Sequence, residues 1–287
     1  LNTTGTVKTT VSGSLTNAAG TITVNSGGSL ITEGSTLTNS ALITNQGTVE
    51  VKASGSFLNQ PGSTLNNLNQ VLVNDTSSFS NAATFANLSY VNVECGSTFT
   101  NSDTLPNSGS FDAGGTFNNA PGATLTNNTG GTFDVKGGAL MTNLSQVTNA
   151  AGGIFINSGI LIDNDTFTNL GAFTNSGILK GIGVFEGILS NSTTGTVAPG
   201  TSPGTLTVDS VFSNFGTVQI ELGGTNPGQY DTLAVTGVAN LGATLQVTLV
   251  NGFVPVSGNA FIILTADSIA DQFAAVNYPS VPGIAWT

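Results

Sequence analysis

Residues 14–55 read SLTNAAGTITVNSGGSLITEG and then STLTNSALITNQGTVEVKASG, two consecutive units of 21 residues with one plan. Each unit opens on Ser or Thr, then a large apolar residue, with Asn close behind. A fixed period of this length is typical of a solenoid, because one short unit cannot bury its own apolar face and must stack on its neighbours. We therefore predict an extended rod built of repeats.

The same signal recurs through the first two thirds of the chain. From Asn17 to Asn164 it crosses 164 − 17 = 147 residues in seven steps, or 21 residues per step. We predict that the asparagines which end the signal form a structural ladder, each side-chain amide bonding to its equivalent in the next coil. The predicted members are Asn17, Asn39, Asn59, Asn81, Asn101, Asn118, Asn143 and Asn164.

Each unit holds about three short runs in which apolar and polar residues alternate, the pattern of half-buried strands. Asn and Gly between the runs suit tight corners. Three strands and three corners per unit predict an all-β fold, a parallel β-helix with coils about 4.8 Å apart. One column of large apolar residues is expected to stack inside: Leu15, Leu37, Phe57, Phe79, Phe99, Phe117 and Leu140.

The pattern changes near residue 188, and we divide the chain into repeats at 1–187 and a C-terminal β-rich region at 188–287. The segment 190–204, SNSTTGTVAPGTSPG, carries the Pro and Gly of a turn or linker. After it the predicted strands lengthen. This region is either further, wider coils or a β cap that covers the open edge of the last coil.

Charge is scarce, since only 7% of residues are charged and the net charge is −11, with four Lys and no Arg or His. This composition argues against nucleic acid, which requires clustered Lys and Arg, and against anionic lipid. No apolar run reaches the roughly 18 residues of a membrane-spanning helix. Because the chain begins at Leu1 within repeat-like sequence, we expect a processed or truncated segment.

The residue types that usually carry catalysis are absent or isolated. Without His there is no common acid-base group or metal ligand, and one cysteine cannot build a zinc site. We predict that Cys95 is a small buried residue in a strand. We expect no enzymatic activity, no catalytic residues and no cofactor.

Carboxylates are the remaining candidates for a site. Asp163 and Asp165 flank Asn164 and could hold Ca²⁺ together at one corner, although we favour a solvated corner. Asp209, Glu221 and Asp231 lie on predicted C-terminal strands.

Pairs of threonines could form a binding surface on the outside of the rod. Thr-x-Thr occurs at Thr21–Thr23, Thr36–Thr38 and Thr205–Thr207. A flat threonine array can bind ice, but these motifs do not share one position in the unit. We therefore expect no such face.

The C-terminal third resembles a known class of exported proteins. TVAPGTSPGTLTV, GTVQIELGGTNPGQYDTLAVTG and LGATLQVTLVNGFVPVSGNAFIIL, within about residues 195–275, are similar to the C-terminal passenger region of bacterial autotransporter-type surface proteins. The resemblance implies a right-handed parallel β-helix, export, and a role in adhesion or cell-surface architecture. It also implies that Asp231, in the YDTLAV segment, bonds a turn. In similar proteins more strand sequence tends to follow YPSVPGIAWT, so we expect a terminal strand or an anchor to be missing here or supplied by a neighbouring subunit.

Two classes of function remain open, with a weaker third. The favoured one is a non-enzymatic structural protein, extracellular or on the bacterial surface: an adhesin, a stalk or a self-assembling filament subunit. Its expected partners are other copies joined end to end, surface glycans or other cells. The alternative is a β-helix that binds or cleaves carbohydrate, for which three Tyr and one Trp are few aromatic residues. The third is a phage-type fibre.

Overall fold

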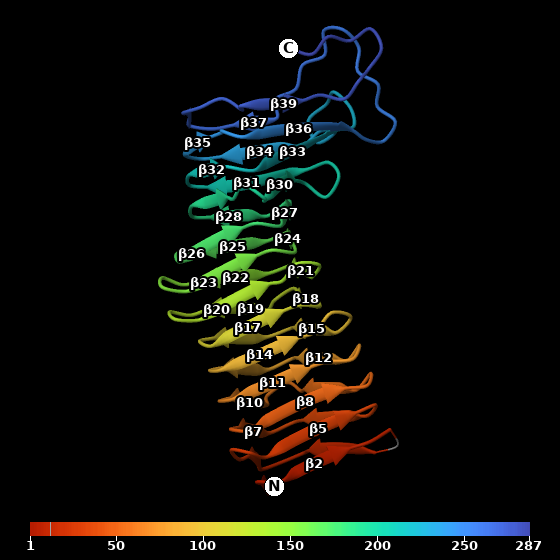
Figure 1. Ribbon diagram of the computed structural model, residues 1–287, viewed down its shortest axis with the longest axis vertical. Helices are drawn as coiled ribbons and strands as arrows, with labels where there is room; N and C mark the ends of the chain where they lie inside the picture. Colours follow the sequence, from red (N-terminus) through yellow and green to blue (C-terminus); the bar gives the residue numbers. More distant parts are fainter. Residues whose placement is uncertain (12) are drawn as a thin grey trace.

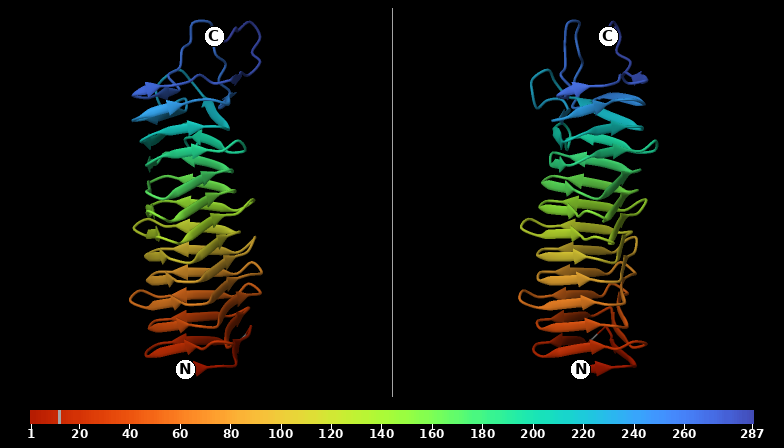
Figure 2. Two further views of the ribbon diagram at one scale, coloured as in Figure 1. Left: turned by 60° about the vertical axis from the view of Figure 1, so that its left-hand side comes forward. Right: turned by 90° about the vertical axis from the view of Figure 1, so that its left-hand side faces the viewer.

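Three parallel β-sheets run the length of a rod in the computed structural model, which describes residues 1–11 and 13–287 (Figure 1). Each coil gives one strand to each sheet, and every sheet has 13 strands. The two chain ends lie at opposite ends of the rod (Figure 2). Strands pair with the equivalents three positions earlier and later in the chain, so the predicted parallel β-helix is confirmed.

The three sheets are called A, B and C. Sheet A contains β1 (Asn2–Thr3), β4 (Thr21–Val24), β7 (Leu42–Asn45), β10 (Thr64–Asn67), β13 (Thr84–Asn87), β16 (Thr104–Asn107), β19 (Thr124–Asn127), β22 (Gln146–Asn149), β25 (Thr166–Asn169), β28 (Val184–Glu186), β31 (Thr205–Asp209), β34 (Thr232–Val235) and β37 (Leu264–Thr265). Sheet B contains β2 (Thr6–Thr9), β5 (Ser29–Glu33), β8 (Thr48–Lys52), β11 (Gln70–Val73), β14 (Tyr90–Val93), β17 (Ser110–Ala113), β20 (Thr132–Val135), β23 (Ile154–Asn157), β26 (Ala172–Asn175), β29 (Leu189–Asn191), β32 (Phe212–Asn214), β35 (Val238–Asn240) and β38 (Ser268–Ile269). Sheet C contains β3 (Ser14–Asn17), β6 (Thr36–Asn39), β9 (Ser56–Asn59), β12 (Ser78–Asn81), β15 (Thr98–Asn101), β18 (Thr116–Asn119), β21 (Leu140–Asn143), β24 (Ile160–Asp163), β27 (Ile178–Gly181), β30 (Thr196–Pro199), β33 (Thr217–Leu222), β36 (Thr244–Leu249) and β39 (Ala275–Asn277).

A four-residue strand follows one rule, in which the second and fourth side chains face inward and the first and third face outward. In β15 the buried residues are Phe99 and Asn101, while Thr98 and Thr100 are half-buried on the outside. Alternation at period two dictates this, because successive side chains point to opposite faces of a strand. The apolar second residue fills the core, and the polar fourth residue sits beside the corner.

The predicted aromatic column lies inside the rod. Phe79 stacks on Phe57 at 4.4 Å and on Phe99 at 4.7 Å between ring centroids, and Phe99 stacks on Phe117 at 5.5 Å. The prediction for Leu140 was wrong by one residue. Because the pairing sets Phe117 opposite Met141, Met141 is buried and Leu140 lies half-buried on the outer face.

Corners bring the backbones of adjacent coils into close contact. At Gly109 a side chain would have no room, since an added Cβ would lie 1.9 Å from the carbonyl oxygen of Ser89 in the coil before. Glycine is therefore required there by the spacing between coils, in line with its role where two backbones approach closely.

The sheets cross the compositional change near residue 188 without a break. β28 pairs with β31, β29 with β32, and β30 with β33. The region after residue 188 therefore begins as further coils, and β33 and β36 have six residues each. Beyond Leu249 only the short strands β37, β38 and β39 continue the sheets, among long loops (Figure 1).

Cys95 corrects another prediction. It lies exposed in the corner after β14, not inside a strand, because β14 ends at Val93 and the following Glu94–Gly96 form the turn. We expect native protein to react with a maleimide about as fast as urea-unfolded protein, since an exposed thiol needs no opening of the fold. Mass spectrometry over time measures this. If the maleimide labelled Cys95 only after unfolding, the thiol would be buried inside the rod, and this placement would be wrong.

Within residues 1–11 and 13–287 the structure is built of strands and turns. It has no helix with the length and apolar character needed to cross a membrane.

Candidate functional site

The asparagine ladder in sheet C runs through the interior beside the corner that leads to sheet A. Asn17 Nδ2 donates to Asn39 Oδ1 at 2.8 Å, and Asn39, Asn59 and Asn81 each donate to the next member at 2.8 to 2.9 Å. A second N–H bond goes to a backbone carbonyl, as from Asn39 to Thr64 at 3.1 Å. Each buried amide is thereby satisfied, which buried polar groups require.

Two predicted ladder members are wrong by one residue. Asn101 bonds to Asn119, not to Asn118, and Asn143 bonds to Asp163, not to Asn164. The rule of inward second and fourth residues explains both errors, because Asn118 is the third residue of β18 and Asn164 follows the end of β24. Asn164 instead accepts a hydrogen bond from the Ile182 backbone N–H at 3.3 Å.

Two further ladders were not predicted. The ladder of sheet A comprises Asn45, Asn67, Asn87, Asn107, Asn127, Asn149 and Asn169. The ladder of sheet B comprises Asn157, Asn175, Asn191 and Asn214. The signal for the sheet A ladder was present in LITN, TLNN and TFAN. In each, an inward apolar residue is second in the strand and Asn is fourth. These side chains are buried, so all three ladders are internal braces.

The ladder of sheet C stops at a carboxylate. Asp163 Oδ1 accepts from Asn143 Nδ2 at 2.7 Å, while Oδ2 is buried with no hydrogen-bond partner in the described part of the chain. The next residue in this column is Gly181, which has no side chain to continue the ladder. Burial raises the pKa of the Asp163 carboxyl to about 7, and the hydrogen bond from Asn143 opposes the rise only in part.

The structure does not bring the Asp163 and Asp165 side chains together on one corner. The Asp163 side chain lies inside the coil, whereas Asp165 is exposed in the turn beyond β24. Among the described residues, no three His, Cys, Asp or Glu side chains gather as metal ligands would.

Asp231 braces a turn, as the sequence predicted. Its Oδ1 accepts from the Gly204 N–H at 2.8 Å, and its Oδ2 accepts from the Glu221 N–H at 2.7 Å. Burial raises the pKa of the Asp231 carboxyl to about 6, although both backbone hydrogen bonds oppose the rise. It lines a groove of about 190 Å³ with Lys180 and Glu221, but its two oxygens already hold the backbone.

Asp231→Asn should loosen this turn. An amide keeps one acceptor and turns its NH₂ toward a backbone N–H, which costs about 1–3 kcal/mol for the group left unpaired. We expect faster hydrogen exchange at the Gly204 and Glu221 amides and a lower urea midpoint. Asp209→Asn is the control, because Asp209 is exposed and accepts only from the Thr236 hydroxyl. Unchanged exchange at both amides would contradict the brace.

Charged side chains gather on the outer face of sheet B. Lys136 Nζ lies 2.6 Å from Asp134 and 3.2 Å from Asp112, and the Tyr90 hydroxyl donates to Asp112 at 3.3 Å. Burial lowers the pKa of Lys136, but its hydrogen bonds to the two carboxylates outweigh this and leave the pKa raised. Lys136 offsets only one of the two carboxylate charges, so the cluster keeps one net negative charge. Such half-exposed pairs contribute little to stability.

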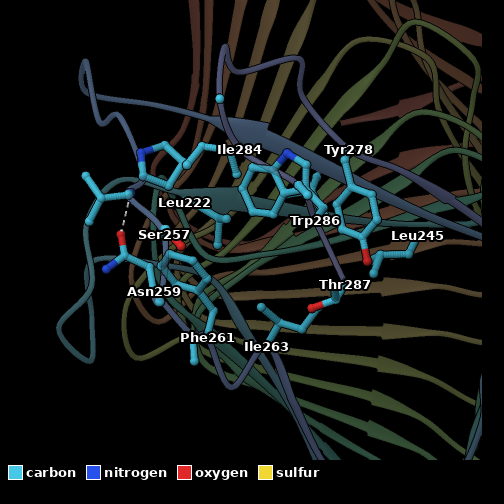
Figure 3. Close-up of a pocket in the computed structure, with 17 residues that line it drawn as sticks. Leu222, Leu245, Ser257, Asn259, Phe261, Ile263, Tyr278, Ile284, Trp286 and Thr287 are labelled. Atoms are coloured by element: carbon cyan, nitrogen blue, oxygen red, sulfur yellow. Dashed lines mark hydrogen bonds between the residues drawn. The ribbon is translucent and has the colours of Figure 1, made fainter.

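A cavity of about 610 Å³ lies at the C-terminal end of the rod (Figure 3). Tyr278 and Trp286 stack beside it with ring centroids 5.3 Å apart and planes 2° apart. Leu222, Leu245 and Phe261 are among its apolar lining residues, Ser257, Asn259 and Thr287 add polar groups, and no Asp, Glu or Lys side chain lines it. The other two tyrosines do not line the cavity: Tyr230 is buried behind the wall residue Phe261, and Tyr90 belongs to sheet B. The arrangement offers apolar contact without a pair of acids.

No family model, curated protein or solved structure matches this chain.

Proposed function

We propose that this chain is a non-enzymatic structural rod of a bacterial surface or extracellular protein, a stalk or adhesin passenger. The observation that carries this is continuity, since all three sheets have a strand in every coil from β1 to β39. Internal ladders and stacked rings join neighbouring coils between Asn17 and Asn214, so this part of the rod should resist bending. A rigid rod of this kind would hold a group at its tip at a fixed distance from the cell surface.

Composition and resemblance support the same function. A surface with few charges, made largely of Thr, Ser and Asn, is poorly suited to nucleic acid. The segment at about residues 195–275 is similar to the passenger region of autotransporter-type proteins, which are exported. The carboxylates are dispersed, paired with Lys136 or engaged with backbone, which favours a structural role over carbohydrate cleavage.

Location on the surface is tested with an antibody against the purified rod. Intact cells of the source organism should be labelled, and brief protease treatment of intact cells should remove the label. The control is a cytoplasmic protein that stays unlabelled until the cells are permeabilised. Labelling that requires permeabilisation would contradict a surface rod.

End-to-end association is the second part of this proposal. Val254, Val256, Ile262 and Ile269 are exposed near the last coil, and edge strands there have unpaired backbone groups on one side. Such edges accept a further strand from another chain. A head-to-tail contact that does not close would produce a filament.

Negative-stain electron microscopy of the purified chain, with and without millimolar calcium, tests association. We expect filaments that salt or calcium promotes, because screening reduces the repulsion between chains of net charge −11. Ile269→Lys should leave single rods, whereas Leu144→Lys, at an exposed corner between β21 and β22 near the middle of the rod, should not. If the unmodified chain forms only single rods under every condition, the filament proposal is wrong, and the proposal of a tethered rod stands.

A further inference from the structure

The outer face of sheet A is a threonine array. From β4 to β25 eight strands place their first and third residues outward, which makes 16 positions, and 11 of them are threonine. The threonines are Thr21, Thr23, Thr44, Thr64, Thr84, Thr104, Thr124, Thr126, Thr148, Thr166 and Thr168. The other five are Leu42, Asn66, Ala86, Pro106 and Gln146, none of them charged.

Strand register aligns the threonines in columns along the rod. Thr64 pairs with Thr84, Thr84 with Thr104, and Thr104 with Thr124. Neighbours in a column are therefore about 4.8 Å apart, and the two columns are about 6.7 Å apart, twice the rise per residue. Complete Thr-x-Thr motifs do not reveal this array, because most of the eight strands have threonine at only one of their two outward positions.

The hydroxyl groups of the array are available to a ligand. Of the 11 threonines, only Thr104 and Thr168 make a side-chain hydrogen bond within the described chain, to Asp103 and Glu186. The β-branch restricts the rotation of each side chain and so fixes the direction of its hydroxyl and methyl. Behind the face, the Asn45 to Asn169 ladder holds seven of the eight strands at constant spacing.

The other two sheets lack this combination. Sheet B carries its ion pairs outward, such as Lys8 with Glu33 and Lys136 with Asp134. Sheet C has hydroxyls early but turns apolar at Leu140 and Ile160. On sheet A, the first charged outward residue after β4 is Glu186 on β28. The array is therefore a face of uniform chemistry on one side of the rod.

We propose that this face binds the ordered water lattice of ice. A rigid, uncharged grid of hydroxyl and methyl groups, repeating in two directions near the oxygen spacings of the prism plane of hexagonal ice, can anchor waters that already occupy lattice positions. The methyl groups disfavour other arrangements of that water, and the hydroxyls bond to it. A charge would impose its own hydration shell, and none of the 16 outward positions carries one, although Asp103 and Glu186 border the array.

Thermal hysteresis and incorporation into a growing ice sphere test the proposal. The unmodified chain should lower the freezing point below the melting point, shape ice crystals and enter the ice. Thr84→Lys, in the middle of a column, should reduce the hysteresis at least tenfold. Thr100→Lys on β15 is the matched control, since Thr100 is half-buried on the outer face of sheet C. Circular dichroism melts verify that both variants are folded.

The outcomes separate cleanly. Hysteresis that Thr84→Lys abolishes and Thr100→Lys preserves supports the face assignment. Absence of hysteresis and exclusion from ice by the unmodified chain would overturn the proposal, as would equal losses in both variants. Retention on crystalline cellulose together with exclusion from ice would show that the lattice it recognises is a polysaccharide, and ice binding would be wrong. End-to-end association is not required for any of these readouts.

Discussion

Asp163→Asn should stabilise the rod at pH 8 by roughly 2–4 kcal/mol. Every Asn member of the sheet C ladder from Asn39 to Asn143 donates a second N–H to the carbonyl of the first residue of a sheet A strand, as Asn143 does to Thr166. The equivalent carbonyl for residue 163 belongs to Val184, which pairs with Thr166. Asp163 therefore places a carboxylate oxygen where the other ladder members place an N–H donor. Asparagine at this position would supply that N–H to the Val184 carbonyl.

The gain should depend on pH with a definite sign. The pKa of Asp163 rises from 3.8 in the unfolded chain to about 7 in the folded one, so the folded state binds the extra proton between these values. The stability that this group contributes is complete below about pH 4 and is lost as the pH rises toward 7. The advantage of Asp163→Asn over the unmodified chain should therefore be small at pH 4 and reach its full size by pH 8.

Urea unfolding at pH 4, 6 and 8 measures this difference. Asp165→Asn is the control, because Asp165 is exposed and its substitution should change the free energy of unfolding by no more than about 0.5 kcal/mol. A variant less stable than the unmodified chain at pH 8 would mean that the buried carboxylate has a partner, and the account of the ladder's end would be wrong.

Phe99→Ala should cost about 3–5 kcal/mol, the range for removing a buried aromatic side chain. Phe99 lies against Phe79 and Phe117 in its own column and meets Phe85 and Phe111 from the other sheets. The substitution leaves a cavity that removes ring contacts within its own coil and with the coils on either side. The strand pairing along the rod limits how far these coils can move to fill the cavity. We expect the midpoint of thermal unfolding to fall markedly.

The control for this prediction is Phe215→Ala. Phe215 is 60% exposed in the corner after β32, so its removal should change stability little. Calorimetry of both variants provides the comparison. Equal effects of the two substitutions would contradict the placement of Phe99 in the core.

The architecture was predictable because its signal is repeated many times. Alternation at period two identifies each strand, and the 21-residue period determines which strands stack. The column of Phe57, Phe79 and Phe99 follows directly. Single-residue errors arose where the local sequence allowed two alignments, as with Asn118 and Asn119 in TFNN, because only the inward rule of the whole strand decides between them.

Other features depend on register, which no single unit reveals. The threonine columns of sheet A arise from residues about 20 positions apart, each unremarkable in its own strand. The unpaired oxygen of Asp163 depends on Gly181 in the following coil, and the C-terminal cavity on loops without a repeat. Cys95 was misassigned because VNVECG reads as one long strand until the turn at Glu94 is known.

The stacking of coils through buried amides is the central claim, and side-chain amide exchange tests it most directly. In ¹⁵N-labelled protein, the Nδ2 protons of Asn101 and Asn107 should exchange slowly, because each is buried and bonded to the next coil. The Nδ2 protons of Asn118 and Asn164, on the outside, should exchange within the dead time. Slow exchange at Asn118 with fast exchange at Asn101 would reverse the faces of the strands and contradict the account.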